Sequence, residues 1–326
     1  MRFQDLPLTE LRDLAESIVT VAGAVEAGLF TALLDSPSTP AELADRVGLD
    51  RRAVGIVLPV LEELGLVEKD EGRYRLSPRG RGQLADTDSD EYQAGGLPLW
   101  LENLKVWVEL PESLRTGRPV SRPDTGDDES DLARFMAGMA AAPAERVGRL
   151  VDATLQRNPR AANVLDLGGG PGHMTRAFVK RGLDGVLLDT PAVVEFVRDA
   201  YGLDAVQGLR TVSADFLSDP LPAGPFDIVL LSNVLHLLPA DECAALLRKV
   251  RPITAPGGVV AIADFVRGRS PRASRFALFM LLRKEGGNTH TFEEHETWLH
   301  EAGFAQVEAV DLDPERQLVT AVRPDD

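Results

Sequence analysis

Residues 163–175 read Asn-Val-Leu-Asp-Leu-Gly-Gly-Gly-Pro-Gly-His-Met-Thr, and this stretch decides the fold. Its apolar start is typical of a buried strand, and four of the next five residues are glycine. Glycine allows a positive φ and lets a ligand lie against the main chain. Because residues 174–178 are compatible with a helix, we expect a strand, a tight turn and a helix.

The spacing of these glycines separates two kinds of nucleotide site. The dinucleotide fingerprint G-x-G-x-x-G holds a pyrophosphate at a helix N-terminus. Here Gly168, Gly170 and Gly172 are spaced by two, and His173 stands where the last glycine of that fingerprint would be. Pro171 also removes a backbone donor. The turn therefore favours a ligand without phosphate.

Bulk composition limits the class of protein. The chain has 326 residues, enough for two domains, and its net charge of −16 repels phosphate backbones, so we expect no nucleic-acid partner. The single cysteine, Cys243, has apolar neighbours and is predicted to be a buried, inert thiol. Since we find no signal-peptide pattern and no apolar run of about 18 residues, we expect a cytoplasmic protein with no membrane partner.

The N-terminal part predicts a small, mainly helical domain. Residues 8–34 have apolar side chains at helical spacing, with Gly23 and Gly28 as expected breaks. Two further helices are predicted at 39–48 and from residue 50 onward. Residues 66–76 then alternate around a glycine turn, which predicts a hairpin. Helix, turn, helix and hairpin together form a winged helix.

From residue 163 onward, strand-like runs alternate with helices, which predicts an α/β fold with a doubly wound, mainly parallel sheet. The expected strands lie near 163–167, 185–189, 209–213, 226–231, 257–264, 306–311 and 317–322. The expected domains are a winged helix at 1–84, a helical linker and substrate-lining segment at 85–150, and a cofactor-binding catalytic domain at 151–326.

The spacing Asp-x-Gly-x-Gly-x-Gly that begins at Asp166 resembles motif I of the class I S-adenosylmethionine (SAM) methyltransferases. The winged helix upstream is similar to the dimerisation domain of the O-methyltransferase family that includes plant caffeate and acetylserotonin methyltransferases. The resemblance covers essentially the whole chain. It implies a Rossmann-like catalytic domain with an antiparallel edge, SAM as cofactor, and a homodimer formed through the N-terminal domain. It also implies methyl transfer to a hydroxyl of a small aromatic secondary metabolite.

Acidic residues follow the predicted second and third strands. Asp189 stands where a doubly wound fold places the acceptor for ribose hydroxyls. In the resembling family, the acid after the third strand accepts the adenine amino group and its neighbour covers the ring, which implies Asp215 and Phe216. A helix cap at Asp189 and a core position for Phe216 are the alternatives. The expected cofactor contacts are Asp166, Gly168, Gly170, Asp189, Asp215, Phe216 and Ser232.

Methylation of a hydroxyl needs a proton acceptor, because a phenol of pKa about 10 is mostly protonated at neutral pH. A base adds roughly 10²–10⁴ in rate, and histidine fits best. In the resembling family the base lies nine positions beyond the acid that opens the fourth strand, which is Asp227 here and implies His236. The family's first supporting glutamate falls on Asp264, which would orient the base. Its second falls on Thr289.

Apolar and aromatic side chains are expected to line the acceptor site. The resemblance places Met136 and Met139 on one lining helix and Phe276 and Met280 on another, with His290 beside the active site. Such a wall suits a flat substrate. A plain core role for the two methionines of the first helix is the alternative.

Two other kinds of function stay open at this point. His236 and His290 could hold a divalent metal, as in relatives of this fold that methylate a carbon of 2-oxo acids. Alternatively, the chain could bind SAM without methylating, or regulate DNA through the winged helix. The second helix of that winged helix offers only Arg51 and Arg52 as cations, which disfavours DNA.

Overall fold

The computed structural model describes residues 5–89, 91–120 and 129–325. The chain separates into two compact units, Met1–Lys105 and Val106–Asp326. None of the helices in the described ranges combines the length and the apolar character needed to traverse a lipid bilayer. The cytoplasmic location stays a prediction. The three functional segments expected at 1–84, 85–150 and 151–326 also stay predictions, because a division into two compact units does not test the role of each segment.

The first unit is a winged helix preceded by a long helix. The hairpin turns at Glu71 and Gly72, both with positive φ, as the alternation of its sequence predicts. The N-terminal helix breaks at Gly28, where φ is 74°, whereas Gly23 lies inside α1 and does not break it. The elements are α1 (Leu8–Glu26), α2 (Leu29–Ala32), α3 (Pro40–Val47), α4 (Arg51–Glu63), β1 (Val67–Asp70), β2 (Arg73–Leu76), α5 (Pro78–Gly80), a π-helical turn (Arg81–Ala85), a 3-10 turn (Ala94–Gly96) and α6 (Leu97–Trp107).

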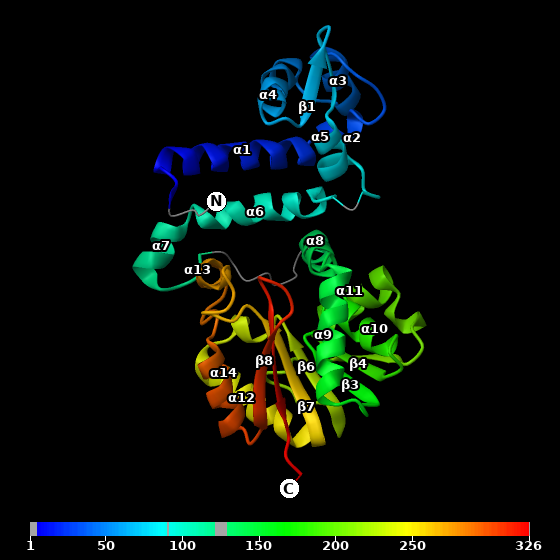
Figure 1. The fold of residues 1–326 in the computed structure, drawn as a ribbon, viewed down its shortest axis with the longest axis vertical. Helices are drawn as coiled ribbons and strands as arrows, with labels where there is room; N and C mark the ends of the chain where they lie inside the picture. The colour runs from blue at the N-terminus through cyan, green and yellow to red at the C-terminus, as the bar shows by residue number, and fades with distance from the viewer. Residues whose placement is uncertain (1–4, 90, 121–128, 326) are drawn as a thin grey trace. The chain divides into compact units, whose positions relative to one another are not determined.

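The second unit is built on a seven-stranded sheet (Figure 1). Its strands are β3 (Asn163–Leu167), β4 (Asp184–Asp189), β5 (Leu209–Ser213), β6 (Phe226–Ser232), β7 (Thr254–Asp264), β8 (Ala305–Asp311) and β9 (Gln317–Val322). The spatial order is β5-β4-β3-β6-β7-β9-β8, parallel from β5 to β7, and β9 pairs antiparallel with both β7 and β8. All the predicted strands are present. The strand order reverses between β3 and β6, where a doubly wound sheet binds its ligand.

Helices cover both faces of this sheet (Figure 1). One face carries α9 (Ala144–Arg157), α10 (His173–Val179) and α11 (Pro191–Tyr201), and the other carries α12 (Ala240–Val250) and α14 (Phe292–Glu301). The remaining helices of the unit are α7 (Leu110–Thr116), α8 (Glu129–Ala140) and α13 (Ala273–Arg283). Alternate strand residues serve the two faces: Val164 packs with α9 and α10, and Leu165 packs with α12 and α14.

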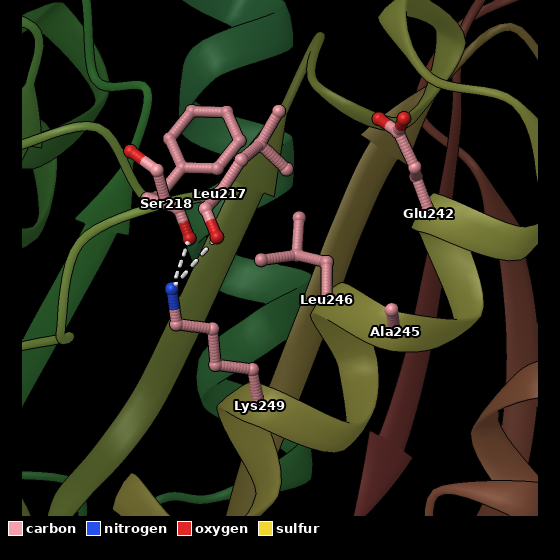
Figure 2. A pocket seen from close by; sticks show the side chains of 7 residues that line it. Leu217, Ser218, Glu242, Ala245, Leu246 and Lys249 are labelled. Atoms are coloured by element: carbon pink, nitrogen blue, oxygen red, sulfur yellow. Dashed lines mark hydrogen bonds between the residues drawn. The ribbon is translucent and has the colours of Figure 1, made fainter.

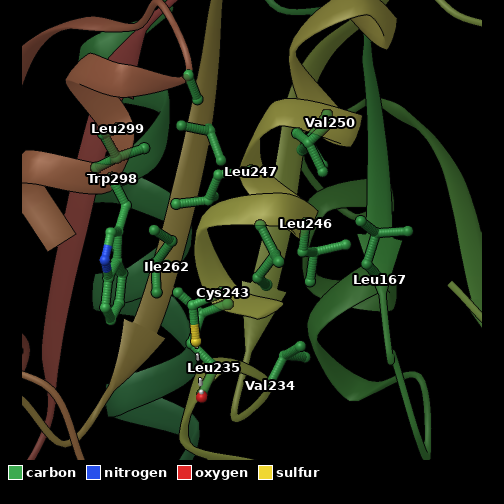
Figure 3. Packing of buried hydrophobic residues seen from close by; sticks show 14 of the residues in the cluster. Leu167, Val234, Leu235, Cys243, Leu246, Leu247, Val250, Ile262, Trp298 and Leu299 are labelled. Carbon is green, nitrogen blue, oxygen red and sulfur yellow. Dashed lines mark hydrogen bonds between the residues drawn. The ribbon is translucent and has the colours of Figure 1, made fainter. Parts of the chain in front are cut away.

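Figure 3 shows the cluster on the second of these faces. Leu246 and Leu247 of α12 pack there with Ile262 of β7 and Trp298 of α14. Cys243 is buried among them, and its Sγ donates to the Leu235 carbonyl at 3.4 Å. Burial raises the pKa of the Cys243 thiol to about 12, so the thiol is inert at neutral pH.

Candidate active site

The glycine-rich turn joins β3 to α10 at the carboxyl end of the parallel strands. Gly168, Gly170 and Gly172 have φ values of 71°, 48° and 76°, which side-chain-bearing residues rarely adopt. A Cβ on Gly168 would lie 3.0 Å from the Val234 side chain. Near a Cβ built on Gly170, the described chain places only the Met136 Sδ, at 3.8 Å. The main chain is therefore open above Gly170, and a ligand can approach it there.

Asp166 is buried under this turn. Its Oδ2 accepts a hydrogen bond from the Thr175 hydroxyl at 2.6 Å, while its Oδ1 has no partner among the described residues. Burial raises the pKa of Asp166 to about 7, because the Thr175 hydrogen bond offsets only part of the desolvation and the Asp189 charge raises it further. An unpartnered buried carboxylate oxygen suits a ligand that carries a cation or hydrogen-bond donors.

Asp189 ends β4 and reaches the same turn. Its Oδ2 accepts from the Gly170 N–H at 2.9 Å, and its Oδ1 accepts from the Thr190 N–H at 2.8 Å. Burial raises the pKa of Asp189, and these two amide hydrogen bonds oppose the rise. Since a carboxylate oxygen has two acceptor positions, both oxygens can still accept from ligand hydroxyls.

Asp215 and Phe216 lie directly after β5. The Asp215 carboxylate accepts from the Leu217 N–H at 2.9 Å and from the Ser218 hydroxyl at 3.0 Å. The Phe216 ring lies beside the glycine turn, with Cε1 3.5 Å from a Cβ built on Gly168. The structure thus brings the predicted cofactor residues from three strand ends to one place.

Lys249 of α12 fixes the loop that carries Asp215 and Phe216 (Figure 2). Its Nζ donates to the carbonyl oxygens of Phe216 at 2.9 Å, Leu217 at 3.1 Å and Asp219 at 2.5 Å. An open cavity of about 340 Å³ beside it is lined by Phe216, Leu217, Ser218, Glu242, Ala245, Leu246 and Lys249. The sequence gives no sign of this arrangement, because a single lysine near the end of a helix is typical of a surface position.

The predicted histidine and aspartate form a buried pair. His236 lies in the short turn Leu235–Leu237 after β6, and its ring Nδ1 is 2.7 Å from the Asp264 Oδ1. The backbone N–H of His236 donates to the Asp264 Oδ2 at 3.2 Å. Burial by itself raises the pKa of Asp264, but His236, Arg316 and the Phe265 amide together lower it to about 2. An ionised Asp264 selects the tautomer with a proton on Nδ1, which leaves the Nε2 lone pair of His236 available.

Aromatic rings surround this pair. The Phe276 ring of α13 lies edge-on to His236, with centroids 4.8 Å apart, and its centroid is 4.1 Å from that of Phe265. Met280 is buried on the same helix, and the Met136 Sδ lies 3.8 Å from a Cβ built on Gly170. Contacts to an acceptor from Met136, Met139, Phe276 and Met280 stay predictions. So does a cofactor contact from Ser232, whose hydroxyl lies 3.4 Å from the Asn233 Nδ2.

The second predicted histidine, His290, is packed in the core. Its Nε2 lies 3.2 Å from the Leu235 carbonyl oxygen and 3.6 Å from the Cys243 Sγ, and its ring packs edge-on against Trp298. Burial lowers the pKa of His290. No cluster of three or more His, Cys, Asp or Glu side chains suited to a metal occurs in the part of the chain that the structure describes. The geometry therefore gives the two-histidine metal site no support.

Arg316, in the loop between β8 and β9, reaches the same aromatic rings without any signal in the sequence. Its guanidinium carbon lies 3.4 Å from the centroid of the Phe265 ring, and one of its Nη atoms donates to the Asn233 Oδ1. Asn233 follows β6 with a φ of 60°. Residues 312–316 read as an acidic turn, and only the pairing of β9 with β7 brings them here.

Comparison with known proteins decides the family. Residues 117–305 match the family model described as an O-methyltransferase domain. The chain is also 31% identical over 300 residues to tetracenomycin polyketide synthesis 8-O-methyl transferase TcmO of Streptomyces glaucescens, which covers 87% of this chain and 86% of that protein. The chain belongs to the O-methyltransferase family. It is a SAM-dependent methyltransferase.

Other relatives of this methyltransferase match at nearly full length. The 3-hydroxy-5-methyl-1-naphthoate 3-O-methyltransferase of Streptomyces sahachiroi is 28% identical over 322 residues, 93% of this chain and 91% of that one. The N,N-dimethyltransferase OxyT of Streptomyces rimosus is 28% identical over 321 residues, 92% and 91% of the two chains. Human N-acetylserotonin methyltransferase, solved in complex with SAM, has a TM-score of 0.83 at 21% identity and full coverage of both chains, which shows the shared fold.

The turn of this methyltransferase fits SAM. The sulfonium and ammonium groups of SAM are cations, and the turn is flanked by Asp189 and by Asp166, whose Oδ1 has no partner among the described residues. The open main chain at Gly170 leaves room for the ligand, and SAM carries no phosphate that Pro171 would disfavour. The two carboxylates and the open turn therefore suit the cofactor that the family uses.

Proposed function

We propose that this methyltransferase transfers a methyl group to a hydroxyl of a small aromatic molecule, with His236 as the general base. The buried pair of His236 and Asp264, in contact with the Phe276 ring, supports the proposal most strongly. Relatives named for a hydroxyl on a naphthoate and on an aminohydroxybenzoate support an aromatic acceptor.

SAM, when bound, supplies an electrophilic methyl group, and the proposed contacts for it are the glycine turn, Asp189, Asp215, Phe216 and Ser232. The Nε2 of His236 accepts the proton of the acceptor hydroxyl. Asp264 holds the Nδ1–H and stabilises the imidazolium that forms, because its pKa of about 2 keeps it ionised. Phe265 and Phe276 pack together and keep water away from the pair, and the Phe276 ring beside His236 offers an apolar surface to the acceptor.

A direct test uses purified chain, SAM with a ¹³C-labelled methyl group, and a panel of phenols, naphthols and hydroxyaryl acids. We expect labelled O-methyl products, located by NMR, and no product from the same compounds with the hydroxyl already methylated. Because one relative is named an N,N-dimethyltransferase, matched anilines belong in the panel. Labelling only on nitrogen or carbon, or labelling of none of the panel, would contradict the proposal.

We also propose a homodimer formed through the first unit. Leu8, Leu14, Ile18 and Val19 expose large apolar side chains on α1, with Leu8 84% exposed. Apolar surface of this kind is typical of a contact between subunits. Light scattering should give a dimer for the native chain and a monomer for the double variant Leu14→Glu, Ile18→Glu. Val310→Glu, at an exposed apolar position of the second unit, should stay dimeric. A native monomer would refute the proposal.

A further inference from the structure

Arg316 is a half-buried cation whose hydrogen bond goes to a neutral group. Within the described residues the bond is made to the amide oxygen of Asn233, while Asp264, Glu315 and Asp313 attract the guanidinium through space and Arg146 repels it. Burial lowers the pKa of Arg316 to about 10, so it is still protonated at neutral pH. Cations removed from water are normally paired with an anion. Arg316 therefore has unused capacity for an anionic partner.

The guanidinium lies over aromatic rings near the proposed base. It stacks on Phe265 at 3.4 Å and lies 5.9 Å from the centroid of Phe276, the ring that meets His236 edge-on. A guanidinium carries five N–H donors in one plane, and in the described part of the chain Asn233 takes one of those of Arg316. A planar fork of free N–H donors is the arrangement that binds a carboxylate through two hydrogen bonds.

We propose that Arg316 binds a carboxylate of the acceptor and so selects hydroxyaryl acids over their neutral analogues. This inference rests on the proposed function, because it assumes that the acceptor lies beside His236 and the Phe276 ring. The carboxylate of SAM is the other possible partner of the same chemistry. The acceptor is favoured because Arg316 contacts the rings beside His236, whereas the glycine turn is flanked by Phe216, Val234 and Met136.

The test measures binding instead of turnover. The protein is saturated with S-adenosylhomocysteine and titrated with 3-hydroxy-2-naphthoate or its carboxamide near neutral pH, followed by ligand fluorescence. We expect the acid to bind about tenfold more tightly than the amide, since a hydrogen bond between charged groups contributes that much. Arg316→Gln should abolish this preference and leave the affinity for S-adenosylhomocysteine unchanged. Arg269→Gln, which removes an exposed arginine paired with Asp311, should keep the preference.

Each other outcome overturns the assignment. Native protein that does not prefer the acid, including protein that binds neither compound, contradicts it, as does Arg316→Gln with the preference intact. A variant that keeps the preference but loses affinity for S-adenosylhomocysteine assigns Arg316 to the cofactor instead. If Arg316→Gln does not fold, Arg316→Lys keeps the charge but loses the planar fork and should retain only part of the preference; full retention refutes the proposal. Binding of the acid without methylation of any panel compound would count against the proposed function alone.

Discussion

The catalytic edge of the sheet has a cofactor half at the ends of β4 and β5 and an acceptor half at the ends of β6 and β7. Different kinds of contact hold these two halves in place. At the ends of β4 and β5, the carboxylates of Asp189 and Asp215 accept hydrogen bonds from main-chain amides. At the ends of β6 and β7, Asp264 also accepts hydrogen bonds from main-chain amides, but side chains bind side chains there as well: His236 meets Asp264 across 28 positions of sequence, and Arg316 meets Asn233 across 83. Main-chain contacts survive most changes of neighbouring residues, whereas each side-chain pair depends on two specific residues.

The largest effect should separate the two halves completely. His236→Ala should lower kcat by about 10²–10⁴, because general-base catalysis contributes that much, while SAM affinity measured by calorimetry stays the same. His300→Ala, at an exposed position near the end of α14, is the matched control and should change neither quantity. Full activity of His236→Ala would show that another group removes the proton and would contradict the assignment of catalysis to the acceptor half.

The next effect concerns stability in the cofactor half. Asp166 has a pKa of about 7 in the folded protein and an ordinary value of 3.8 when unfolded. Between those values the folded state binds more protons, so the free energy of unfolding should fall as pH rises, by up to about 4 kcal/mol. Asp166→Asn should reduce this slope and be the more stable form at high pH, while Asp189, whose pKa burial also raises, keeps a share of the slope.

Urea unfolding of ligand-free protein at a series of pH values measures this slope. Asp264 stays outside the window, because its pKa is lowered to about 2 and its contribution is lost only as pH falls from about 4 toward 2. Asp199→Asn, an exposed carboxyl on α11, should keep the native slope. An equal slope in Asp166→Asn would show that other groups cause it.

A smaller effect should appear as binding alone. Asp189→Ala should weaken SAM by about ten- to a hundredfold, since it removes a charged acceptor that also holds the Gly170 amide, while kcat at saturating SAM changes little. Calorimetry and saturation kinetics together measure the two quantities. A fall in kcat equal to that of His236→Ala would mean that the two halves act as one unit.

The smallest effect tests the loop after β5. Lys249→Met removes three hydrogen bonds to carbonyl oxygens and should raise the Kd for SAM several-fold. Lys249→Arg should restore part of the affinity, and the neighbouring exposed change Arg248→Met should have no effect. An unchanged Kd in Lys249→Met would show that the loop is held without this lysine.

The same difference between main-chain and side-chain contacts explains which residues of the site can be predicted from the sequence. The glycine turn and the strands that carry Asp189 and Asp215 follow from local patterns, because each residue sits at the end of a recognisable strand. His236 and Asp264 were predicted from a family spacing, and the structure brings them together. Arg316 could not be predicted, since its place depends on β9 inserting between β7 and β8. His290 was expected beside the substrate but is packed in the core, because spacing along a loop does not say which way a side chain turns.

The pairing of β9 with β7 has one more consequence. Gln317, the first residue of β9, sits opposite Asp264 and accepts the Val266 N–H through its side chain at 3.1 Å, which anchors the strand one position after Arg316. Adding or deleting a residue between 312 and 315 would change the path of the loop before the arginine and leave the strand anchored. If Arg316 binds the acceptor as proposed, a change in the length of this loop would alter the choice of acceptor while the cofactor residues at the ends of β4 and β5 stay in place.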